Sequence, residues 1–294
     1  MPTGETTSTS LIDSLPLVVS NARQVREFPV GFMNTVDRQT LPKGAGVAWR
    51  EIVLARLTAQ AVGQTTPLDN PQEITDTLFQ IEPEMYGIHT ILTRKVMDQI
   101  SRNVYGQIGS LMQHAIQRRK ELDGFAIYDG ATFSRPGAGV TLASGVISAI
   151  VTQISGNVTE HAQMDETKYA WLGPYQVHDL QAELGAAVGT YTIQPGATSE
   201  AYERGIKAVT MVGGAEIKIG GNIRVDANDD AHGGVHARTG IVLVEWEFPD
   251  SYTDVLKNRG GAEAAWLYDG YAYGERSSGT LFGRVLSDAV APTA

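Results

Sequence analysis

Residues 93 to 123 read TRKVMDQISRNVYGQIGSLMQHAIQRRKELD, and this stretch decides how the rest of the chain is interpreted. Its apolar residues recur in steps of three and four from Val96 to Leu122, which predicts an amphipathic helix. Such a helix would be about 45 Å long at about 1.5 Å per residue, whereas an average helix has only about 11 to 12 residues. We therefore expect a spine helix that spans most of one domain.

Both ends of the expected spine helix carry boundary signals. Thr93 stands where an N-cap belongs, and Gly124 stands where a C-cap glycine belongs. The last turn is basic, with Arg118, Arg119 and Lys120 in succession. Positive charge is favourable there because the carbonyl end of a helix carries a partial negative charge. We therefore interpret these three residues as a helix-end feature rather than as a phosphate-binding patch.

The segment before the spine helix predicts a long two-stranded projection. Residues 47 to 62, VAWREIVLARLTAQAV, place apolar side chains at alternate positions, with Glu51 as the interruption. The turn-forming run GQTTPLDNPQE follows, and a second extended run covers residues 74 to 81. A pair of strands is marginally stable in water by itself, so we expect this projection to lie on something else.

Four residues of the projection are candidate contacts with another protein chain. They combine an aromatic anchor with both signs of charge: Trp49, Arg50, Glu51 and Arg56. This mixture suits a protein interface as well as an ordinary surface, and both interpretations stay open at the level of the sequence.

Beyond the spine helix, the chain mixes helices with strands. Helices are expected over residues 142 to 154 and 175 to 184. Short strands punctuated by glycine are expected within residues 205 to 213, 215 to 225 and 240 to 248. Aromatic and small residues alternate in the C-terminal part, which ends in a further expected strand. The fold class is therefore α+β.

Composition and charge exclude several classes of protein. The chain has 23 lysine and arginine residues against 33 aspartate and glutamate residues, a formal charge of −10, so a surface that neutralises DNA phosphates is not expected. The absence of cysteine excludes a disulfide framework, thiolate metal sites and a cysteine nucleophile. The first residues lack the features of a secretory signal, and the longest charge-free stretch is only half apolar, so no membrane span is expected.

The best candidate for a metal site is residues 226 to 236, DANDDAHGGVH. The side chains that could act as ligands are spaced as in a calcium loop or as paired imidazoles: Asp226, Asn228, Asp230, His232 and His236. Ala231 and Ala237 replace the turn glycine and the bidentate glutamate of a calcium loop, so a polar turn is the preferred interpretation. Phosphate-binding loops, the nucleophile elbow and the zinc helix motif are absent from the sequence. We therefore predict no catalytic, cofactor-binding or metal-binding residues, with a metal-dependent enzyme that uses this loop as an alternative.

Two carboxylates, Glu245 and Glu247, alternate with the aromatic residues Trp246 and Phe248. In a strand, this alternation places both carboxylates on one face and both rings on the other. Paired carboxylates can act as acid and base. Because the sequence offers no partner group for them, we expect a solvated face.

Taken in order, these elements resemble the major capsid proteins of tailed phages, which have the Hong Kong 97 fold. The order is a polar arm, a long two-stranded loop, a spine helix, an α/β insertion and a returning strand segment. Tyr86, Gly87, Leu92 and Thr93 look like that family's junction between the E-loop and the spine helix. Three further segments look like parts of its A-domain and P-domain: WLGPYQVHDL at 171 to 180, VTMVGGAEIKIGGNI at 209 to 223 and YAYGERSSGTLFGRVLSDA at 271 to 289.

The resemblance implies a division of the chain into the parts of that fold. The N-terminal arm would cover residues 1–40, and the E-loop would cover residues 41–92. The P-domain with the spine helix would follow at 93–139, the A-domain at 140–261, and the returning P-domain strand with the C-terminus at 262–294.

The resemblance also implies a function. Subunits of this family form the hexamers and pentamers of an icosahedral head that encloses double-stranded DNA, with the arm and the E-loop reaching over neighbours. The expected partners are further copies of the chain, a separate scaffolding protein, a portal and decoration proteins. The expected location is the virion, after assembly in the host cytoplasm. An encapsulin-like shell, which encloses proteins, is the alternative with the same architecture.

Two departures from the family pattern carry expectations of their own. In some relatives an E-loop lysine forms an isopeptide bond to an asparagine of a neighbour, but here no lysine occurs between Lys43 and Lys95. We therefore predict no covalent cross-link of that kind. No long helical region precedes the expected arm, which implies a separate scaffolding protein or a leader outside this chain.

Overall fold

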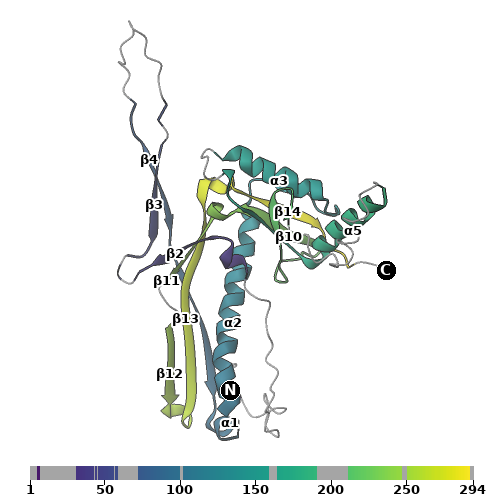
Figure 1. The fold of residues 1–294 in the computed structure, drawn as a ribbon. Coiled ribbons are helices and arrows are strands. Elements are labelled where there is room, and N and C mark those ends of the chain that lie inside the picture. The colour runs from purple at the N-terminus through teal and green to yellow at the C-terminus, as the bar shows by residue number, and fades with distance from the viewer. Residues whose placement is uncertain are drawn as a thin grey trace.

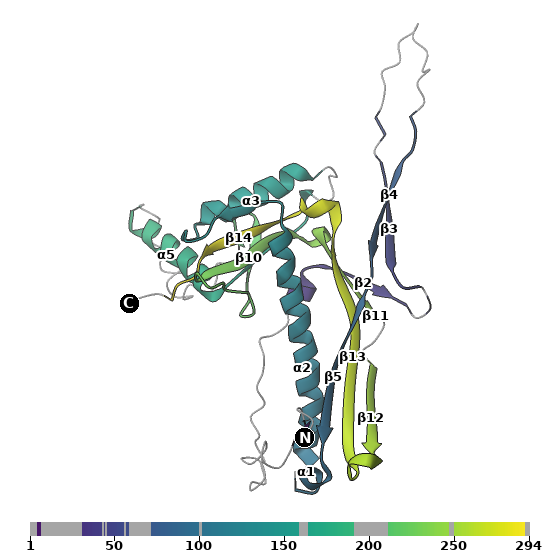
Figure 2. The same ribbon diagram turned by 180° about the vertical axis from the view of Figure 1, so that it is seen from behind.

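A computed structural model describes the chain at residues 5–6, 31–42, 44, 46–55, 57–58, 72–99, 102–158, 164–190, 211–246 and 250–291. Most of the fold consists of two mixed sheets, and a long helix runs along the first of them (Figure 1). The second sheet lies near one end of this helix, and a two-stranded hairpin projects away from both sheets (Figures 1 and 2). The α+β class predicted from the sequence is confirmed.

The spine helix is described in two pieces. α1 spans Arg94–Gln99, α2 spans Arg102–Ala126, and the 3₁₀ helix η2 (Ile127–Gly130) follows directly. Thr93 precedes α1, and its carbonyl oxygen accepts a hydrogen bond from the amide of Val96 at 3.0 Å. The spine helix and the position of its N-terminal boundary are therefore confirmed.

The predicted C-terminal boundary at Gly124 is wrong, because α2 continues through this residue to Ala126. A β-carbon at position 124 would lie 2.5 Å from two ring carbons of Phe32, which is closer than carbon atoms can approach. Gly124 is therefore required for the close packing of Phe32 against the helix, and not for a left-handed cap.

The first sheet lies along α2. Its strands, in order across the sheet, are β1 (Glu5–Thr6), β5 (Glu84–Leu92), β13 (Ala262–Glu275), β11 (Ile241–Trp246) and β2 (Asp37–Leu41), and β12 (Asp250–Leu256) also pairs with β13. The central strand β13 is 14 residues long. It pairs with β5 along one side, and with β12 and then β11 along the other.

The second sheet has its own core. Its strands, in order, are β6 (Ser134–Pro136), β14 (Phe282–Asp288), β10 (Asp230–Ala237), β7 (Lys168–Leu172), β9 (Ala215–Ile219) and β8 (Met211–Val212). Two helices contribute buried apolar side chains to this core, α3 (Ser144–Asn157) and α5 (Pro174–Thr190). These helices confirm the two that the sequence predicts at 142 to 154 and 175 to 184, with somewhat later C-terminal ends.

The remaining elements are short. The hairpin consists of β3 (Trp49–Leu54) and β4 (Asp76–Ile81), which pair only with each other. Four single 3₁₀ turns complete the description: η1 (Phe32–Asn34), η3 (Arg238–Gly240), η4 (Lys257–Arg259) and η5 (Arg276–Gly279). Among the helices in the described ranges, none has the length and apolar character needed to cross a bilayer.

The aromatic residue Phe32 joins the two sheets. It is fully buried, and its ring lies 5.0 Å from that of Phe125 on α2 and 6.0 Å from that of Trp171 on β7. Val36 is also buried, and the neighbouring strand β2 pairs in parallel with β11. Residues 31–40, which we expected to belong to the arm, are therefore anchored on the two sheets: Phe32 and Val36 fill the junction, and β2 adds a strand to the first sheet. The rest of the expected arm, apart from β1, lies outside the described residues.

Strand β10 was not predicted, because its residues were interpreted as a polar turn. It is the strand between β14 and β7, and all of its residues are buried. Its two glycines make this possible. A β-carbon at Gly234 would lie 2.3 Å from the ring of Tyr128, and one at Gly233 would lie 2.6 Å from the carbonyl oxygen of Trp171. The polar composition of this segment therefore reflects close packing rather than exposure to solvent.

Strand pairing crosses the borders that we expected between the parts of the chain. β11 and β12, within the expected A-domain at 140–261, pair with β13 in the first sheet. β14, within the expected returning segment at 262–294, pairs with β10 in the second sheet. The chain thus contributes to both sheets on either side of the expected border at 261, and the assignment of residues to named domains stays a prediction.

Candidate assembly surface

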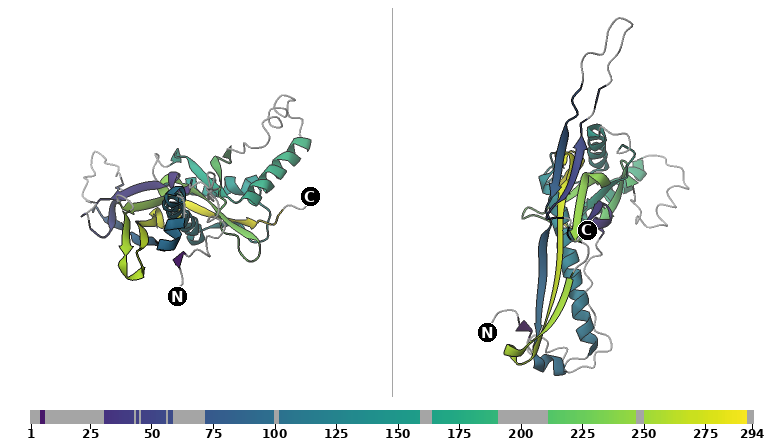
Figure 3. Two further views of the ribbon diagram at one scale, coloured as in Figure 1. Left: turned by 90° about the horizontal axis from the view of Figure 1, so that it is seen from below. Right: turned by 90° about the vertical axis from the view of Figure 1, so that its left-hand side faces the viewer.

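Strands β3 and β4 form the two-stranded projection that the sequence predicts. They pair antiparallel, from Trp49 opposite Ile81 at the root to Leu54 opposite Asp76. The hairpin extends away from both sheets (Figure 1 and Figure 3, right). The described strands are shorter than the predicted extended runs, and residues 59–71, which connect them, lie outside the described part of the chain.

The hairpin exposes apolar side chains on both faces. Ile52, Leu54 and Leu78 are 63%, 66% and 56% exposed and share one face. Val53, on the opposite face, is 51% exposed. Apolar surface of this extent on a projecting element is typical of a site that another protein covers.

The root of the hairpin, in contrast, is packed. The rings of Trp49 and Phe79 meet nearly edge to face, with centroids 6.1 Å apart. Both rings cover a small buried cluster formed by β2, β4 and β11: Leu41, Ile81, Val242 and Val244. A β-carbon at Gly274 would lie 2.4 Å from Ile81, so this glycine allows the root to sit directly on β13. Packing within the chain therefore ends a few residues above the root.

An ion-pair cluster fixes the same root. Arg276 on η5 donates a hydrogen bond from Nε to Oε2 of Glu51 at 2.9 Å, and its Nη1 pairs with Oδ2 of Asp37 at 2.8 Å. The guanidinium also donates to the carbonyl oxygen of Thr239 at 3.1 Å. Because all four groups are partly buried, this cluster holds the hairpin at a defined angle to the first sheet.

The four candidate contact residues thus differ in their surroundings. Trp49 and Glu51 contact their own chain at the root. Arg50 is exposed opposite Gln80, and no ion pair of its side chain is found within the described part. Arg56 lies outside the described residues. The exposed apolar residues were not singled out by the alternation, but the consecutive run Ile52, Val53 and Leu54 could have indicated that both faces are apolar.

Comparisons with known proteins agree on the architecture. No family model and no curated protein matches the sequence. Solved structures do match: the mature capsid of bacteriophage PhiM1 has a TM-score of 0.67 at 13% identity, over 94% of this chain and 93% of that one. The capsid of cyanophage P-SCSP1u has a TM-score of 0.69 at 11% identity, over 95% of both chains. The SrpI encapsulin complex from Synechococcus elongatus has a TM-score of 0.60 at 10% identity, over 94% and 95%.

The chain has the Hong Kong 97 fold. The order of elements on which the resemblance was based is therefore confirmed. Hairpin β3–β4 and helices α1 and α2 lie where the sequence predicts the two-stranded projection and the spine helix.

The histidines of the candidate metal loop do not meet. His232 and His236 both lie in β10, where four residues span about 13 Å. His232 Nδ1 is 2.5 Å from Oδ1 of Asp129 on η2. His236 is fully buried, with Nε2 3.1 Å from the carbonyl oxygen of Thr35 and Nδ1 2.6 Å from the hydroxyl of Tyr128. A spacing of four residues brings two histidines together on a helix. In a strand, the same spacing holds them too far apart to bind one ion.

Protein contacts also account for the polarity of this loop. Since Nε2 of His236 must donate to a carbonyl, Nδ1 accepts from Tyr128, and both ring nitrogens are satisfied. Burial lowers the pKa of His236 to about 4, and the hydrogen bond to Thr35 opposes this shift. Asp226 Oδ1 accepts from the amides of Asn228 and Asp230, at 2.8 Å and 3.1 Å, which is the polar turn preferred from the sequence. In the described ranges, no cluster of three or more potential ligands could hold a metal ion.

The alternation of Glu245 with aromatic residues predicts a solvated face, and this prediction is wrong for its carboxylate. Lys120 on α2 is buried, and its Nζ lies 2.7 Å from Glu245 Oε1 and 2.7 Å from Asp269 Oδ2. Burial would raise the pKa of Glu245, but the hydrogen bonds and charges of Lys120 and Arg38 outweigh burial and hold this pKa below its usual value. Lys120 therefore ties α2 to β11 and β13, rather than only completing a basic helix end. Glu247 lies outside the described residues.

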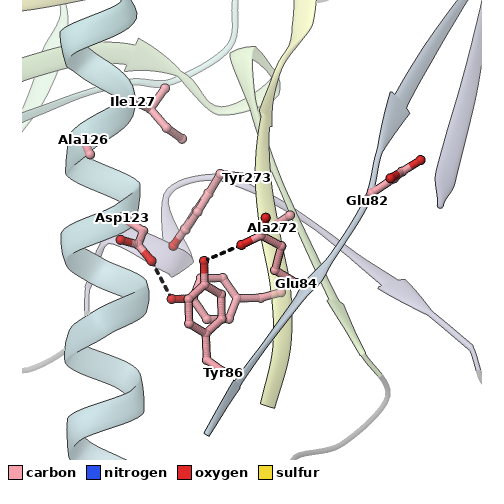
Figure 4. Close-up of a pocket in the computed structure, with 9 residues that line it drawn as sticks. Glu82, Glu84, Tyr86, Asp123, Ala126, Ile127, Ala272 and Tyr273 are labelled. Carbon is pink, nitrogen blue, oxygen red and sulfur yellow. Dashed lines mark hydrogen bonds between the residues drawn. The ribbon is translucent and has the colours of Figure 1, made fainter. Parts of the chain in front are cut away.

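A pocket of about 350 Å³ lies where α2, β5 and β13 meet (Figure 4). The rings of Tyr86 and Tyr271 stack there, with centroids 4.6 Å apart. The hydroxyl of Tyr271 donates to Asp123 at 2.7 Å, and that of Tyr86 donates to Glu84 at 3.2 Å. Burial and the bond to Asp123 raise the pKa of Tyr271, so it remains a donor at neutral pH. The bond to Asp123 ties the spine helix to β13, and the ring stack ties β13 to β5, the strand that leads out of the hairpin.

Proposed function

We propose that this chain is the major capsid protein of a tailed double-stranded DNA phage, and that it forms the hexamers and pentamers of an icosahedral head. The observation that carries the proposal is the extent of the structural likeness. It runs over 94% and 95% of this chain against the PhiM1 and P-SCSP1u capsids, and over nearly all of those chains. A likeness of this extent suits a dedicated shell subunit, because little of the chain is left for another activity.

The distribution of apolar surface supports the same function. A shell subunit must keep part of its apolar surface uncovered until neighbours arrive. Hairpin β3–β4 has this property, since its root is packed on the chain and its outer part is exposed on both faces. The apolar side chains Ile52, Leu54 and Leu78 would be buried against a neighbouring subunit.

The four candidate residues would take different parts in that contact. Arg50 would reach a neighbour directly, because its side chain is exposed beside the apolar surface. Trp49 and Glu51 would act at the root, where they fix the angle of the hairpin. Arg56 completes the set as a further candidate, on the strength of the sequence alone.

The expected division of the chain belongs to the same proposal. The arm would cover residues 1–40, anchored on its own subunit through 31–40, and the E-loop would cover 41–92, the P-domain 93–139 and 262–294, and the A-domain 140–261. In an assembled head, the A-domain would lie near the centre of each ring, with the arm and the E-loop reaching over neighbouring subunits.

The charge of the chain suits a container for DNA. A formal charge of −10 would let packaged DNA leave, whereas a strongly basic inner wall would hold it through the release of counterions. The chain would therefore enclose the genome without binding a particular sequence, and would have no catalytic role. A scaffolding protein, a portal and decoration proteins are the proposed partners, with assembly in the host cytoplasm and a final location in the virion.

An encapsulin-like shell is the second candidate, because the SrpI encapsulin complex shares the fold over 94% of this chain. The enclosed material separates the two functions. Nuclease-protected DNA inside purified particles would support the phage capsid, while a defined protein inside them would support the compartment.

The first experiment is the assembly of the purified chain, alone and co-expressed with a scaffolding protein. Size-exclusion chromatography and negative-stain microscopy would report closed shells or rings of hexamer size if the proposal is right. A monomer of 31.6 kDa under both conditions would contradict it.

A further inference from the structure

Strand β12 forms an open edge of the first sheet. It pairs with β13 over seven consecutive residues, from Asp250 opposite Tyr268 to Leu256 opposite Ala262. Among the described strands, none pairs with its other side. The side chains of Tyr252 and Val255 are 57% and 49% exposed. Figures 1 and 2 show β12 at the outer margin of the sheet, on the side of β13 away from β5.

Such an edge presents unpaired amide and carbonyl groups to any extended chain that approaches. Folded proteins usually obstruct an edge of this kind with a proline, charged side chains or a bulge. The sequence from 250 to 256, DSYTDVL, contains no proline, its pairing with β13 runs without a bulge, and its two charged residues, Asp250 and Asp254, restrict the registers open to a partner strand. The backbone of β12 is therefore a regular template for one more strand.

We propose that β12 pairs antiparallel with β12 of a second copy of this chain, across a two-fold axis at Thr253. This inference rests on the proposed function, because it requires copies of the chain to meet in a shell. The contact is of the self-complementary kind, in which the same patch is used by both copies.

The charges of the strand select this register. An axis at Tyr252 would set Asp250 of each copy opposite Asp254 of the other, and an axis at Asp254 would set two aspartates against each other. Like charges directly opposite in a sheet are destabilising. An axis at Thr253 pairs all seven residues and opposes no two carboxylates.

The Thr253 register also places a favourable pair at its centre. Thr253 would face Thr253 of the second copy, a favourable cross-strand pair. Tyr252 would stand opposite Asp254, and Ser251 would stand opposite Val255. Tyr252 already packs near Tyr268 of β13, with ring centroids 6.3 Å apart, so its ring would bridge the joint between the copies. The first sheets of two subunits would then form one continuous sheet.

The absence of cysteine from the chain allows a direct test. In an antiparallel pair, residues directly opposite have Cα atoms about 4.5 to 5.5 Å apart, which is within the range that a disulfide can bridge. Assembled particles of Thr253→Cys, mildly oxidised, should therefore yield a dimer of twice 31.6 kDa on a non-reducing denaturing gel.

Two further variants test the register. Ser251→Cys and Val255→Cys should each give little dimer alone. In either variant, the cysteines of the two subunits would lie about 13 Å or more apart along the strand direction. Particles assembled from a mixture of the two should give dimer, since these positions would lie opposite each other. The expected yield for Thr253→Cys and for the mixture is several-fold higher than for either single variant.

The outcomes separate this inference from the proposed function. Shells of Thr253→Cys that give no dimer would overturn the β12 contact and leave the capsid function standing. Equal dimer yields from Thr253→Cys and Ser251→Cys alone would also overturn it, because the two β12 strands would then not be paired in one fixed register. Failure of the unaltered chain to assemble under any condition would remove the proposed function, and this inference with it.

Discussion

Strand β10 and hairpin β3–β4 place opposite kinds of residue in opposite surroundings. β10 consists of Asp, Ala, His, Gly and Val residues, and all of it is buried. The hairpin is rich in Ile, Val and Leu, and most of these side chains are exposed above the root. Burial in this fold therefore depends on which elements surround a segment and not on the polarity of its own residues. β14, β7 and Tyr128 surround β10, while the outer hairpin would be covered by another subunit.

The largest loss of stability is expected at Lys120, which, like the polar residues of β10, is buried. Replacing it by methionine would leave the carboxylates of Glu245 and Asp269 without their shared cation, so Lys120→Met should lower the free energy of unfolding by about 3 to 5 kcal/mol. Urea denaturation of unassembled subunits would measure this. The matched control is Arg119→Met, whose exposed pair with Asp123 contributes about 1 kcal/mol or less. Equal effects of the two substitutions would show that Lys120 has no special role inside the fold.

The packing of β10 can be tested at Gly234. A valine there would collide with the ring of Tyr128, so Gly234→Val should lower the free energy of unfolding by about 3 kcal/mol. Gly109 on α2 provides the control, because a β-carbon there meets no atom within 4 Å. Gly109→Ala should be neutral or should stabilise the helix by up to about 1 kcal/mol. If Gly234→Val unfolded at the same urea concentration as the unaltered chain, the close approach of β10 to Tyr128 would be refuted.

The buried imidazole of β10 predicts a dependence of stability on pH. The pKa of His236 is about 4 in the folded chain, against an ordinary value of 6.5. The unfolded chain therefore binds more protons between these values, and stability falls as the pH is lowered from about 6.5 to about 4. The contribution of His236 should make unfolding about 2 kcal/mol easier at pH 5 than at pH 7. His236→Gln should flatten this part of the profile, whereas Gly109→Ala, which removes no titratable group, should leave its slope unchanged.

The smallest effect on the subunit itself is expected at the hairpin. Ile52→Thr with Leu78→Thr should change the free energy of unfolding by only about 0.5 kcal/mol, because both side chains are already in water. The same pair should prevent or greatly slow shell formation, as followed by light scattering. A control of Thr77→Ser on β4 should assemble normally. Normal assembly of the Ile52 and Leu78 variant would show that the apolar hairpin is not a subunit contact.

Features set by local sequence could be predicted, and features set by distant partners could not. The spine helix follows from a periodicity within one segment, and the hairpin follows from two extended runs on either side of a turn-forming stretch. Gly124 was misread as a cap because its function depends on Phe32, which is far away in the sequence.

The same limit applies to the candidate surface. Glu51 was correctly placed on the hairpin, but its partner Arg276 is 225 residues away, so its part in fixing the root could not be foreseen. The buried state of β10 depends likewise on Tyr128 and Trp171, neither of which is a sequence neighbour. Composition alone therefore favoured a polar loop where the fold places a strand.

The length of β13 has a mechanical consequence. Its ladders to β5, β12 and β11 run perpendicular to the strand, so a pull along its axis loads many hydrogen bonds in shear at the same time. Among the described strands, hairpin β3–β4 has no ladder to either sheet, so a pull at its tip would load only the packing and ion pairs at its root. Tension within a wall built from this subunit would thus be carried by β13, while the hairpins would be the parts that peel and re-seat.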